Sequence, residues 1–190
     1  SAWVNEGILH ESEARTNLLT YSSKFDNAAW TKINATVTVD AATAPDGSSA
    51  ADLVTATGAS GRVIASYTFA AEAYTFSAYL KFSSQTDTLL RVFDGTSTFT
   101  LTLSWSAGVP YFVSNTGTAY TISDESNGWY RVAIAATTSA GSGTVQIYTN
   151  GFGSSGSSLV YGAQLESSGG GLLGPTPSSY IPTVSSTATR

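Results

Sequence analysis

Two stretches of the sequence alternate strictly between two faces, and this period of two constrains the fold more than any other feature. In Ser126–Ala136, the turn-forming pair Asn127-Gly128 precedes a run in which Tyr130, Val132 and Ile134 alternate with other residues. Leu159–Glu166 alternates in the same way. A period of two that is rich in β-branched and aromatic residues is typical of strands. No stretch shows a comparable helical stripe, so the chain is predicted to consist of strands arranged around these two.

Further strands are expected along the chain at intervals of about 8–12 residues, separated by turns that contain Gly, Asp or Pro. The expected strands are Asn17–Tyr21, Thr36–Val39, Ala51–Thr55, Arg62–Phe69, Tyr74–Phe82, Leu89–Phe93, Phe99–Trp105, Pro110–Val113, Ala119–Ile122, Tyr130–Thr137, Thr144–Tyr148 and Leu159–Leu165. One helical turn is expected at Phe25–Trp30. This pattern predicts an all-β fold, a two-sheet antiparallel β-sandwich of jelly-roll type.

The length of 190 residues fits one domain. We expect residues 1–16 to form an N-terminal arm and residues 17–190 to form a single β-sandwich domain. Within that domain, residues 167–177 are rich in Gly, Ser and Pro and are expected to form a flexible loop.

The composition excludes several classes of function. The chain has no cysteine, which removes thiol catalysis, zinc–thiolate sites and disulfides. Only 11% of residues are charged and the net charge is −5, so the basic surface of a nucleic-acid-binding protein is missing. No run approaches the roughly 18 apolar residues that a membrane helix needs, so no membrane insertion is expected. Surfaces rich in Ser, Thr, Asn and Gly are common in extracellular and virion β-proteins.

Five blocks of the sequence, in order, resemble segments of tailed-phage and prophage structural proteins. They are GILHESEARTNLLTYSSKFDNAAWTK (Gly7–Lys32), TAPDGSSAADLV (Thr43–Val54), NGWYRVAI (Asn127–Ile134), YGAQLE (Tyr161–Glu166) and SSYIPTVSSTATR (Ser178–Arg190). The resemblance implies a β-sandwich similar to carbohydrate-binding modules and lectin-like jelly rolls, appended to a tail fibre, tail spike, capsid spike or decoration protein. Members of this family usually carry a longer N-terminal part, and we expect this chain to be a fragment of a longer protein.

Two segments depart from the family pattern. Leu103–Phe112 has Trp105 where family members more often have a small or polar turn residue. Gly169–Gly174 separates the GAQLE block from the SYIPT block, which usually lie closer together. We expect both segments to mark what is particular to this protein.

Candidate catalytic groups are sparse. The single histidine, His10, lies in the N-terminal arm, and no GxSxG elbow is present. Paired carboxylates could support glycoside hydrolysis, but the candidates lie mostly in turns, where Asp is favoured for local reasons. These candidates are Asp87, Asp94, Asp124, Glu125 and Glu166. The chain is therefore predicted not to be an enzyme.

Aromatic side chains are the candidates for ligand binding, because saccharides stack on flat apolar faces. Most aromatics are expected in the core, namely Trp30, Trp129, Phe76, Phe82, Phe99 and Tyr161. Others lie near turns or on polar faces. The predicted ligand-binding residues are Trp105, Tyr111, Tyr148, Asn150 and Phe152.

A structural calcium ion is a further possibility, because Ca²⁺ takes oxygen ligands that strand ends can supply. The conceivable donors are Asp46, Asp52, Gln164 and Glu166. The alternative is that Asp46 stabilises its own turn and Glu166 is simply exposed. No other cofactor is expected.

Three hypotheses about function remain open. The first is a non-catalytic carbohydrate- or receptor-binding module on the virion surface, which attaches to a host cell-surface polysaccharide. The second is a structural, trimerisation or decoration module that contacts other virion subunits as a homo-oligomer, with a trimer favoured. The third and least supported is a polysaccharide depolymerase.

Overall fold

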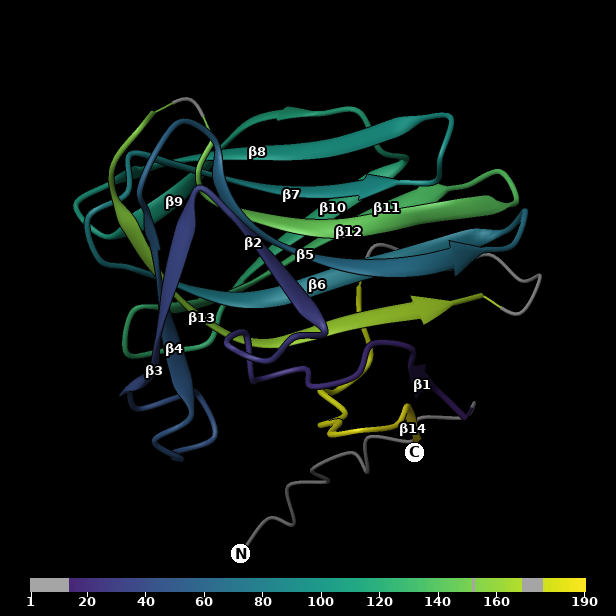
Figure 1. Ribbon diagram of the computed structural model, residues 1–190, viewed down its shortest axis with the longest axis horizontal. Helices are drawn as coiled ribbons and strands as arrows, with labels where there is room; N and C mark the ends of the chain where they lie inside the picture. The colour runs from purple at the N-terminus through teal and green to yellow at the C-terminus, as the bar shows by residue number, and fades with distance from the viewer. Residues whose placement is uncertain (1–13, 152, 169–175) are drawn as a thin grey trace, which may run out of the picture.

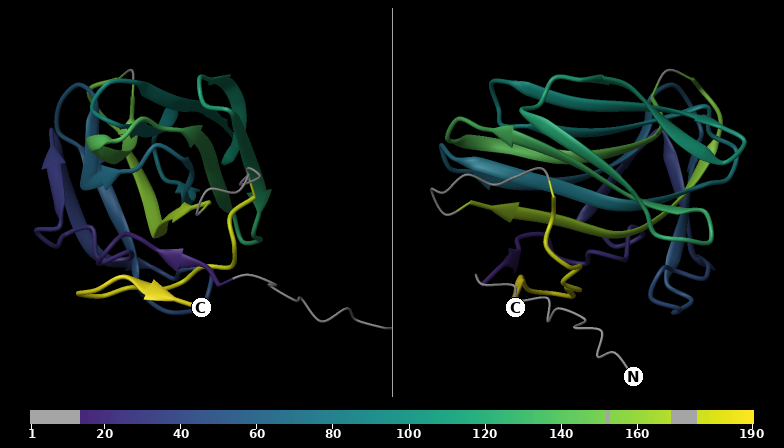
Figure 2. Two further views of the ribbon diagram at one scale, coloured as in Figure 1. Left: turned by 90° about the vertical axis from the view of Figure 1, so that its right-hand side faces the viewer. Right: turned by 180° about the vertical axis from the view of Figure 1, so that it is seen from behind.

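The computed structural model describes residues 14–151, 153–168 and 176–190, and it consists of two antiparallel six-stranded sheets packed face to face (Figures 1 and 2). One sheet, called the β6 sheet here, has the order β10-β11-β6-β13-β4-β3. The other, called the β12 sheet, has the order β2-β5-β12-β7-β8-β9, and β1 and β14 form a separate pair. This architecture confirms the predicted all-β, jelly-roll sandwich. The described part of the chain contains no helix long and apolar enough to cross a membrane.

The strands follow the predicted ones closely in the middle of the chain. They are β1 (Thr16–Asn17), β2 (Trp30–Ile33), β3 (Ala35–Ala42), β4 (Ala51–Ala56), β5 (Gly61–Phe69), β6 (Ala73–Phe82), β7 (Asp87–Phe93), β8 (Thr98–Ser106), β9 (Val109–Asn115), β10 (Ala119–Asp124), β11 (Trp129–Thr137), β12 (Gly141–Asn150), β13 (Ser157–Ser167) and β14 (Ala188–Thr189).

Alternation along the strands sorts side chains between the core and the two outer faces. The β6 sheet contributes inward residues such as Phe76, Leu80 and Ile134, and the β12 sheet contributes residues such as Leu90 and Ile147, all at most 1% exposed. Burying a side chain of this kind stabilises the fold by roughly 1.5–3 kcal/mol.

Most of the aromatic residues predicted for the core are buried. Trp30 and Phe76 are fully buried in the core, and Phe99 is half-buried against it. Trp129 and Tyr161 are at most 5% exposed, but they lie in a second buried cluster on the outer face of the β6 sheet. Phe82 was predicted in the core and is 37% exposed, so that prediction is wrong. It is the last residue of β6, where the strand runs past the packed interior.

The N-terminal region differs from the prediction in two ways. Phe25–Trp30 does not form a helical turn. It lies within successive reverse turns, in which the N–H groups of Lys24, Asn27 and Trp30 each bond the carbonyl three residues earlier. A strand was expected over Asn17–Tyr21, but regular pairing stops at Asn17, opposite Ala188.

Residues from both ends of the described chain lie beside β13, where β1, β14 and the C-terminal segment are seen below that strand (Figure 1). The N-terminal segment bonds the backbone of β13 at Leu165 and Ala163. Asn17 is fully buried there and its amide donates to the carbonyls of Ala163 and Ile181. Its Oδ1 accepts the N–H groups of Leu19 and Leu165. One side chain therefore ties the N-terminal segment, β13 and the C-terminal segment together.

Candidate functional site

A groove runs along the outer face of the β6 sheet, and three adjoining pockets form it. Its walls are the β3–β4 loop, residues 43–50, the hairpin turn between β10 and β11, and the C-terminal segment at residues 176–182. Glu125 lines all three pockets, and Pro45 lines two of them. The groove is therefore continuous around the exposed carboxylate of Glu125.

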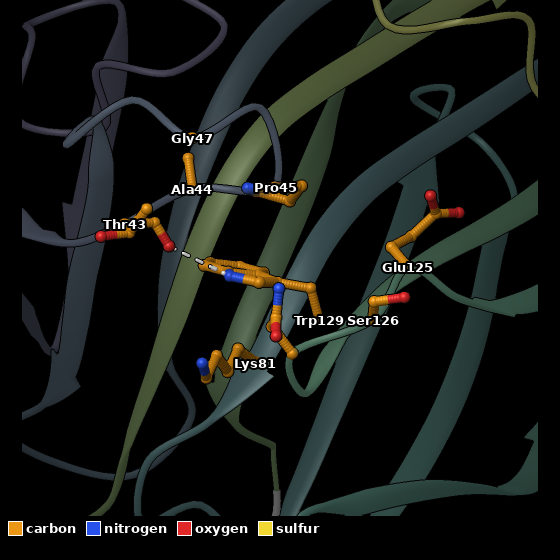
Figure 3. A pocket seen from close by; sticks show the side chains of 9 residues that line it. Thr43, Ala44, Pro45, Gly47, Lys81, Glu125, Ser126 and Trp129 are labelled. Carbon is orange, nitrogen blue, oxygen red and sulfur yellow. Dashed lines mark hydrogen bonds between the residues drawn. The ribbon is translucent and has the colours of Figure 1, made fainter.

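The first pocket, of about 320 Å³, lies against Trp129 (Figure 3). The indole Nε1 donates to the carbonyl of Thr43 at 3.1 Å, which fixes the ring beneath the β3–β4 loop. The Lys81 ammonium lies 5.9 Å from the ring centroid, within range of a cation–π contact. Trp129 is only 2% exposed, so the ring supports the pocket wall more than it offers a free surface.

The hairpin turn beside this pocket follows the sequence signal Asn127-Gly128. Ser126, Asn127 and Gly128 all have positive φ, at 70°, 54° and 78°. Asn and Gly tolerate this left-handed conformation better than other residues do. The turn places Glu125 at the rim and Trp129 at the base of the groove.

The second pocket, of about 400 Å³, has three tyrosines at its base. Tyr79 and Tyr161 are directly opposite each other on β6 and β13, with ring centroids 6.0 Å apart. Tyr180 reaches in from the C-terminal segment and makes an edge contact with each ring, at 6.1 and 5.3 Å. Pro45 and Pro182 complete the lining.

Gly162 makes this arrangement possible. It has a φ of +58° within the irregular part of β13, and a Cβ there would lie 3.0 Å from the Tyr79 ring and 3.2 Å from the Tyr180 ring. A larger residue at this position would be strained and would push the two rings apart.

A carboxylate is fixed at the rim of the second pocket. Asp46 accepts the Tyr161 hydroxyl on Oδ2 at 2.6 Å, and its Oδ1 accepts both the hydroxyl and the N–H of Ser48. The hydrogen bonds from Ser48 and Tyr161 lower the pKa of Asp46 below its usual value, so this group is an anion at neutral pH.

The phenols keep their protons. Burial raises the pKa of Tyr79, Tyr161 and Tyr180, and for Tyr161 the neighbouring Asp46 carboxylate raises it further. The pocket therefore combines neutral aromatic and proline surfaces with the carboxylate oxygens of Asp46 and Glu125. Such a surface can contact C–H groups and accept hydrogen bonds from hydroxyls. Its volume lies in the range of small-ligand sites.

The predicted ligand-binding residues do not come together in this groove. Trp105 is 8% exposed in the core, where its Nε1 donates to Thr88 at 2.9 Å. Tyr111 is 52% exposed on β9, and Tyr148 is 4% exposed on β12. Asn150 is buried and bonds Ser155 and Gly153, while Phe152 lies outside the described residues. Ligand binding by these residues stays a prediction, and the burial of Trp105, Tyr148 and Asn150 does not favour it.

The predicted calcium donors are also dispersed. Asp52 lies on the same face of β4 as the core residue Val54, and burial raises its pKa although the N–H groups of Asp40 and Phe25 oppose this. Glu166 lies on β13, six positions beyond the residue that pairs with Asp52, which is about 20 Å along a strand.

The side chains of the other donors are engaged by the protein. Gln164 and Glu166 bond the C-terminal segment at Ile181 and Ser178, and Asp46 bonds Ser48 and Tyr161. Within the described residues, no three acidic or histidine side chains form a metal-binding group. Calcium binding stays a prediction.

Sequence reasoning missed most residues that form the groove, above all Pro45, Tyr79, Tyr180 and Pro182, and it considered Glu125 only as a candidate hydrolytic carboxylate. All but Tyr79 and Glu125 belong to the five blocks of the family pattern, which we interpreted as elements of the fold. The available signal was the spacing of those blocks. Four of the five blocks, all but Gly7–Lys32, contribute lining residues, but their convergence depends on the tertiary structure.

Comparisons with protein-family models and with curated proteins gave no match. Among solved structures, the chain is similar to the CBM22-1–GH10 modules of Clostridium thermocellum xylanase 10B in complex with xylohexaose (TM-score 0.49, 10% identity, 85% of this chain and 29% of that one). It is also similar to the enzymatically active domain of bacteriophage CBA120 tailspike protein 4 (TM-score 0.48, 12% identity, 80% and 21%). A third is the carbohydrate-binding module CBM6cm-2 of Cellvibrio mixtus lichenase 5A in complex with cellotriose (TM-score 0.43, 12% identity, 80% and 95%).

The chain spans less than a third of the length of the first two of these structures. At identities of 10–12% and TM-scores below 0.5, these similarities do not assign a function to it.

Proposed function

We propose that the chain is a non-catalytic carbohydrate-binding module that holds a saccharide in the groove on the β6 sheet. The observation that carries the proposal is the tyrosine pocket, where Tyr79, Tyr161 and Tyr180 lie beside the fixed carboxylate of Asp46. A sugar ring presents C–H groups on its faces and hydroxyls around its edge. Aromatic and proline surfaces suit the first, and carboxylate acceptors suit the second.

The carboxylates favour binding over cleavage. Glycosidases use one carboxylic acid whose pKa is raised so that it can protonate the leaving group. The hydrogen bonds to Asp46 instead lower its pKa, so they hold it as an anion. Asp46 is therefore suited to accept hydrogen bonds from hydroxyls and not to donate a proton.

In its biological setting, we infer a module of a phage-type virion appendage that attaches to a polysaccharide of the host surface. The support is the resemblance of the five sequence blocks to tailed-phage structural proteins. Tail or capsid location, other virion subunits as partners and a trimeric assembly belong to this same proposal.

A structural, subunit-joining module is the second candidate, and a specific surface favours it. β9 is an edge strand of the β12 sheet, and its residues Val109, Tyr111, Phe112 and Val113 are 45–52% exposed. The Phe112 ring also stacks on Tyr120 of the neighbouring sheet, with centroids 4.6 Å apart. Apolar edge surfaces of this kind commonly mark contacts between subunits.

A glycan-array screen, followed by calorimetric titration of any glycan retained, tests the first candidate. Glu125→Gln and Pro182→Ala are informative variants, because both residues line the groove and are exposed, so neither change removes core packing. Each variant is expected to weaken binding, and loss of the charge-assisted bond at Glu125 corresponds to about tenfold or more. Asp26→Asn, which removes an exposed carboxylate that lines none of the three pockets, is the matched control.

No retained glycan, or a glycan bound equally well by all three variants, would reject the groove as a binding site. Light scattering on the same samples tests the second candidate. A stable oligomer that becomes monomeric on Tyr111→Ser and Val113→Ser substitution, without any glycan affinity, would establish the structural module instead.

A further inference from the structure

A second cluster lies on the opposite side of the sandwich, on the outer face of the β12 sheet. Tyr148 of β12 lies between β5 and β7, and each of these strands supplies an arginine that covers its ring. The guanidinium carbon of Arg62 is 5.1 Å from the ring centroid and that of Arg91 is 4.7 Å from it. These contacts leave Tyr148 only 4% exposed, whereas both arginines remain partly exposed.

The protein holds the two guanidinium groups in place with neutral partners. Arg91 donates to the Tyr148 hydroxyl and, through Nε, to Thr100, while Tyr148 donates to Gln146. Arg62 donates from Nη1 to the carbonyl of Ser60. These bonds and the ring beneath fix the direction of both side chains, so little side-chain entropy remains to be lost when a ligand binds.

Neither arginine has an acidic partner among the described residues. The ion pair found there joins Lys24 to Asp40, in another part of the molecule. The Nε atom of Arg62 is buried and makes no hydrogen bond to any described residue. In a chain with 13 acidic and 8 basic residues, two neighbouring arginines without a described carboxylate partner leave positive charge available to an anionic ligand.

The remaining groups on this face are hydroxyls together with the apolar side chains of Leu89 and Ile64, which are opposite Tyr148 and Gln146. By strand register, Thr100 is opposite Arg91, and Thr102 and Ser104 continue the same face of β8. Asp87 also lies on this face, but its carboxylate accepts the N–H of Gly151 and the hydroxyl of Thr86. The surface around the arginines can therefore form hydrogen bonds to sugar hydroxyls, and among the described residues Asp87 is held by neutral donors and forms no ion pair with Arg62 or Arg91.

We propose that Arg62 and Arg91 bind the carboxylate of an acidic saccharide lying across β5, β12 and β7. A guanidinium presents two parallel N–H donors that match the two oxygens of a carboxylate, and such bonds are stronger than neutral ones. Tyr148 is a positioning residue in this site, because it orients the arginines and lies beneath them. The groove on the β6 sheet is rimmed by carboxylates and suits neutral sugars, so this inference does not depend on it.

Titration with polygalacturonate tests the proposal, with the fully methyl-esterified polymer as the neutral probe. The wild-type protein is expected to bind the acid and not the ester. Arg62→Gln and Arg91→Gln are each expected to weaken binding about tenfold or more. Arg91→Lys keeps the charge but loses the paired donors, so it is expected to weaken binding as well.

Two controls separate this site from general charge attraction and from the groove. Lys24→Gln removes one positive charge from an exposed ion pair elsewhere and is expected to leave the affinity unchanged. Glu125→Gln, which tests the groove, is also expected to leave the affinity for polygalacturonate unchanged. Failure of the groove proposal and failure of the arginine proposal can therefore be recognised separately. Circular dichroism and thermal unfolding verify that each variant is folded, and Arg62→Lys replaces Arg62→Gln if the latter unfolds.

Three results would overturn the proposal. The first is no binding of polygalacturonate at low salt. The second is equal weakening by Lys24→Gln, which would indicate long-range attraction alone. The third is binding of the methyl ester, or tighter binding of dextran sulfate, that Arg62→Gln and Arg91→Gln weaken as they weaken binding of polygalacturonate, because either would exclude a carboxylate-selective site.

Discussion

The hydroxyl of Tyr161 donates to Oδ2 of Asp46 at 2.6 Å, and this bond joins β13 to the β3–β4 loop across the groove. The same bond contributes to lowering the pKa of Asp46 and to raising that of Tyr161. One contact therefore fixes both the shape of the pocket and the charge at its rim.

Tyr161→Phe is expected to raise the pKa of Asp46 and to destabilise the fold by about 1 kcal/mol, because a charge-assisted bond is lost while the ring is kept. The lowered pKa of Asp46 stabilises the fold above about pH 3.9, the pKa of Asp in the unfolded chain, and this stabilisation is lost as the pH falls further. In Tyr161→Phe, this acid-induced loss of stability should therefore be smaller. Carbon-detected NMR titration of Asp46 and urea denaturation measure the two effects. Tyr111→Phe, at an exposed position outside the groove, is the control, and a pKa of Asp46 that does not change would contradict the assignment.

Alkaline conditions are expected to destabilise the protein through its buried phenols. Burial raises the pKa of Tyr74, Tyr79, Tyr161 and Tyr180. In the unfolded chain tyrosine titrates near pH 10, so below that pH both states are protonated and this contribution is fully present. Above it the unfolded state releases protons first, and stability falls as pH rises.

Urea denaturation at pH values of about 8 and 11, combined with the ultraviolet absorbance of tyrosinate, measures this loss. The tyrosinate absorbance of the four buried tyrosines is expected to appear only as the protein unfolds. A free energy of unfolding that is equal at both pH values would contradict the expected coupling.

Asn17→Ala is expected to destabilise the fold by about 3 kcal/mol or more. The substitution leaves the backbone groups of Ala163, Leu165 and Ile181 buried without the partner that Asn17 provides. Hydrogen exchange at the Leu165 amide should accelerate before global unfolding, because the terminal segments lose their common anchor. Asn115→Ala, which removes only local bonds to Gly117, is the control and is expected to cost about 1 kcal/mol.

The sequence predicts the sandwich well because its strongest signals are local. The alternation in β6 and β11 and the Asn127-Gly128 turn act over a few residues, and the structure confirms them. In β13 the alternation is interrupted at Gly162, so Tyr161 and Ala163 lie on opposite faces of the sheet. The segment Phe25–Trp30 was harder to predict. Its side chains pack Phe25 against Trp30 in the core, and tertiary packing selects reverse turns that propensity does not indicate.

The binding surfaces could not be predicted in the same way. Arg62 and Arg91 are 29 positions apart, and only the order β5-β12-β7 brings them to Tyr148. Sequence reasoning selected Tyr148 from its polar strand face but had no means of identifying the arginines that cover it. The groove residues Asp46, Glu125 and Tyr180 likewise come from three distant loops or segments.

The sequence and the structure give different roles to Trp105. It was predicted to bind ligand because it is near a turn in a segment that departs from the family pattern, but it packs in the core against Phe82 and Tyr130. Trp105→Ala is therefore expected to destabilise the fold by about 3–5 kcal/mol. Trp105→Phe retains most of the apolar volume but leaves Thr88 without its indole partner, so it should cost less.

Both variants, where folded, are expected to bind glycans and polygalacturonate with wild-type affinity, because Trp105 lies in neither proposed surface. Thermal unfolding and calorimetric titration on the same samples distinguish the two interpretations. Lost affinity in a Trp105→Phe protein of near-native stability would restore Trp105 as a ligand-binding residue. It would also place the saccharide at the end of β8, away from the groove and from the arginine pair.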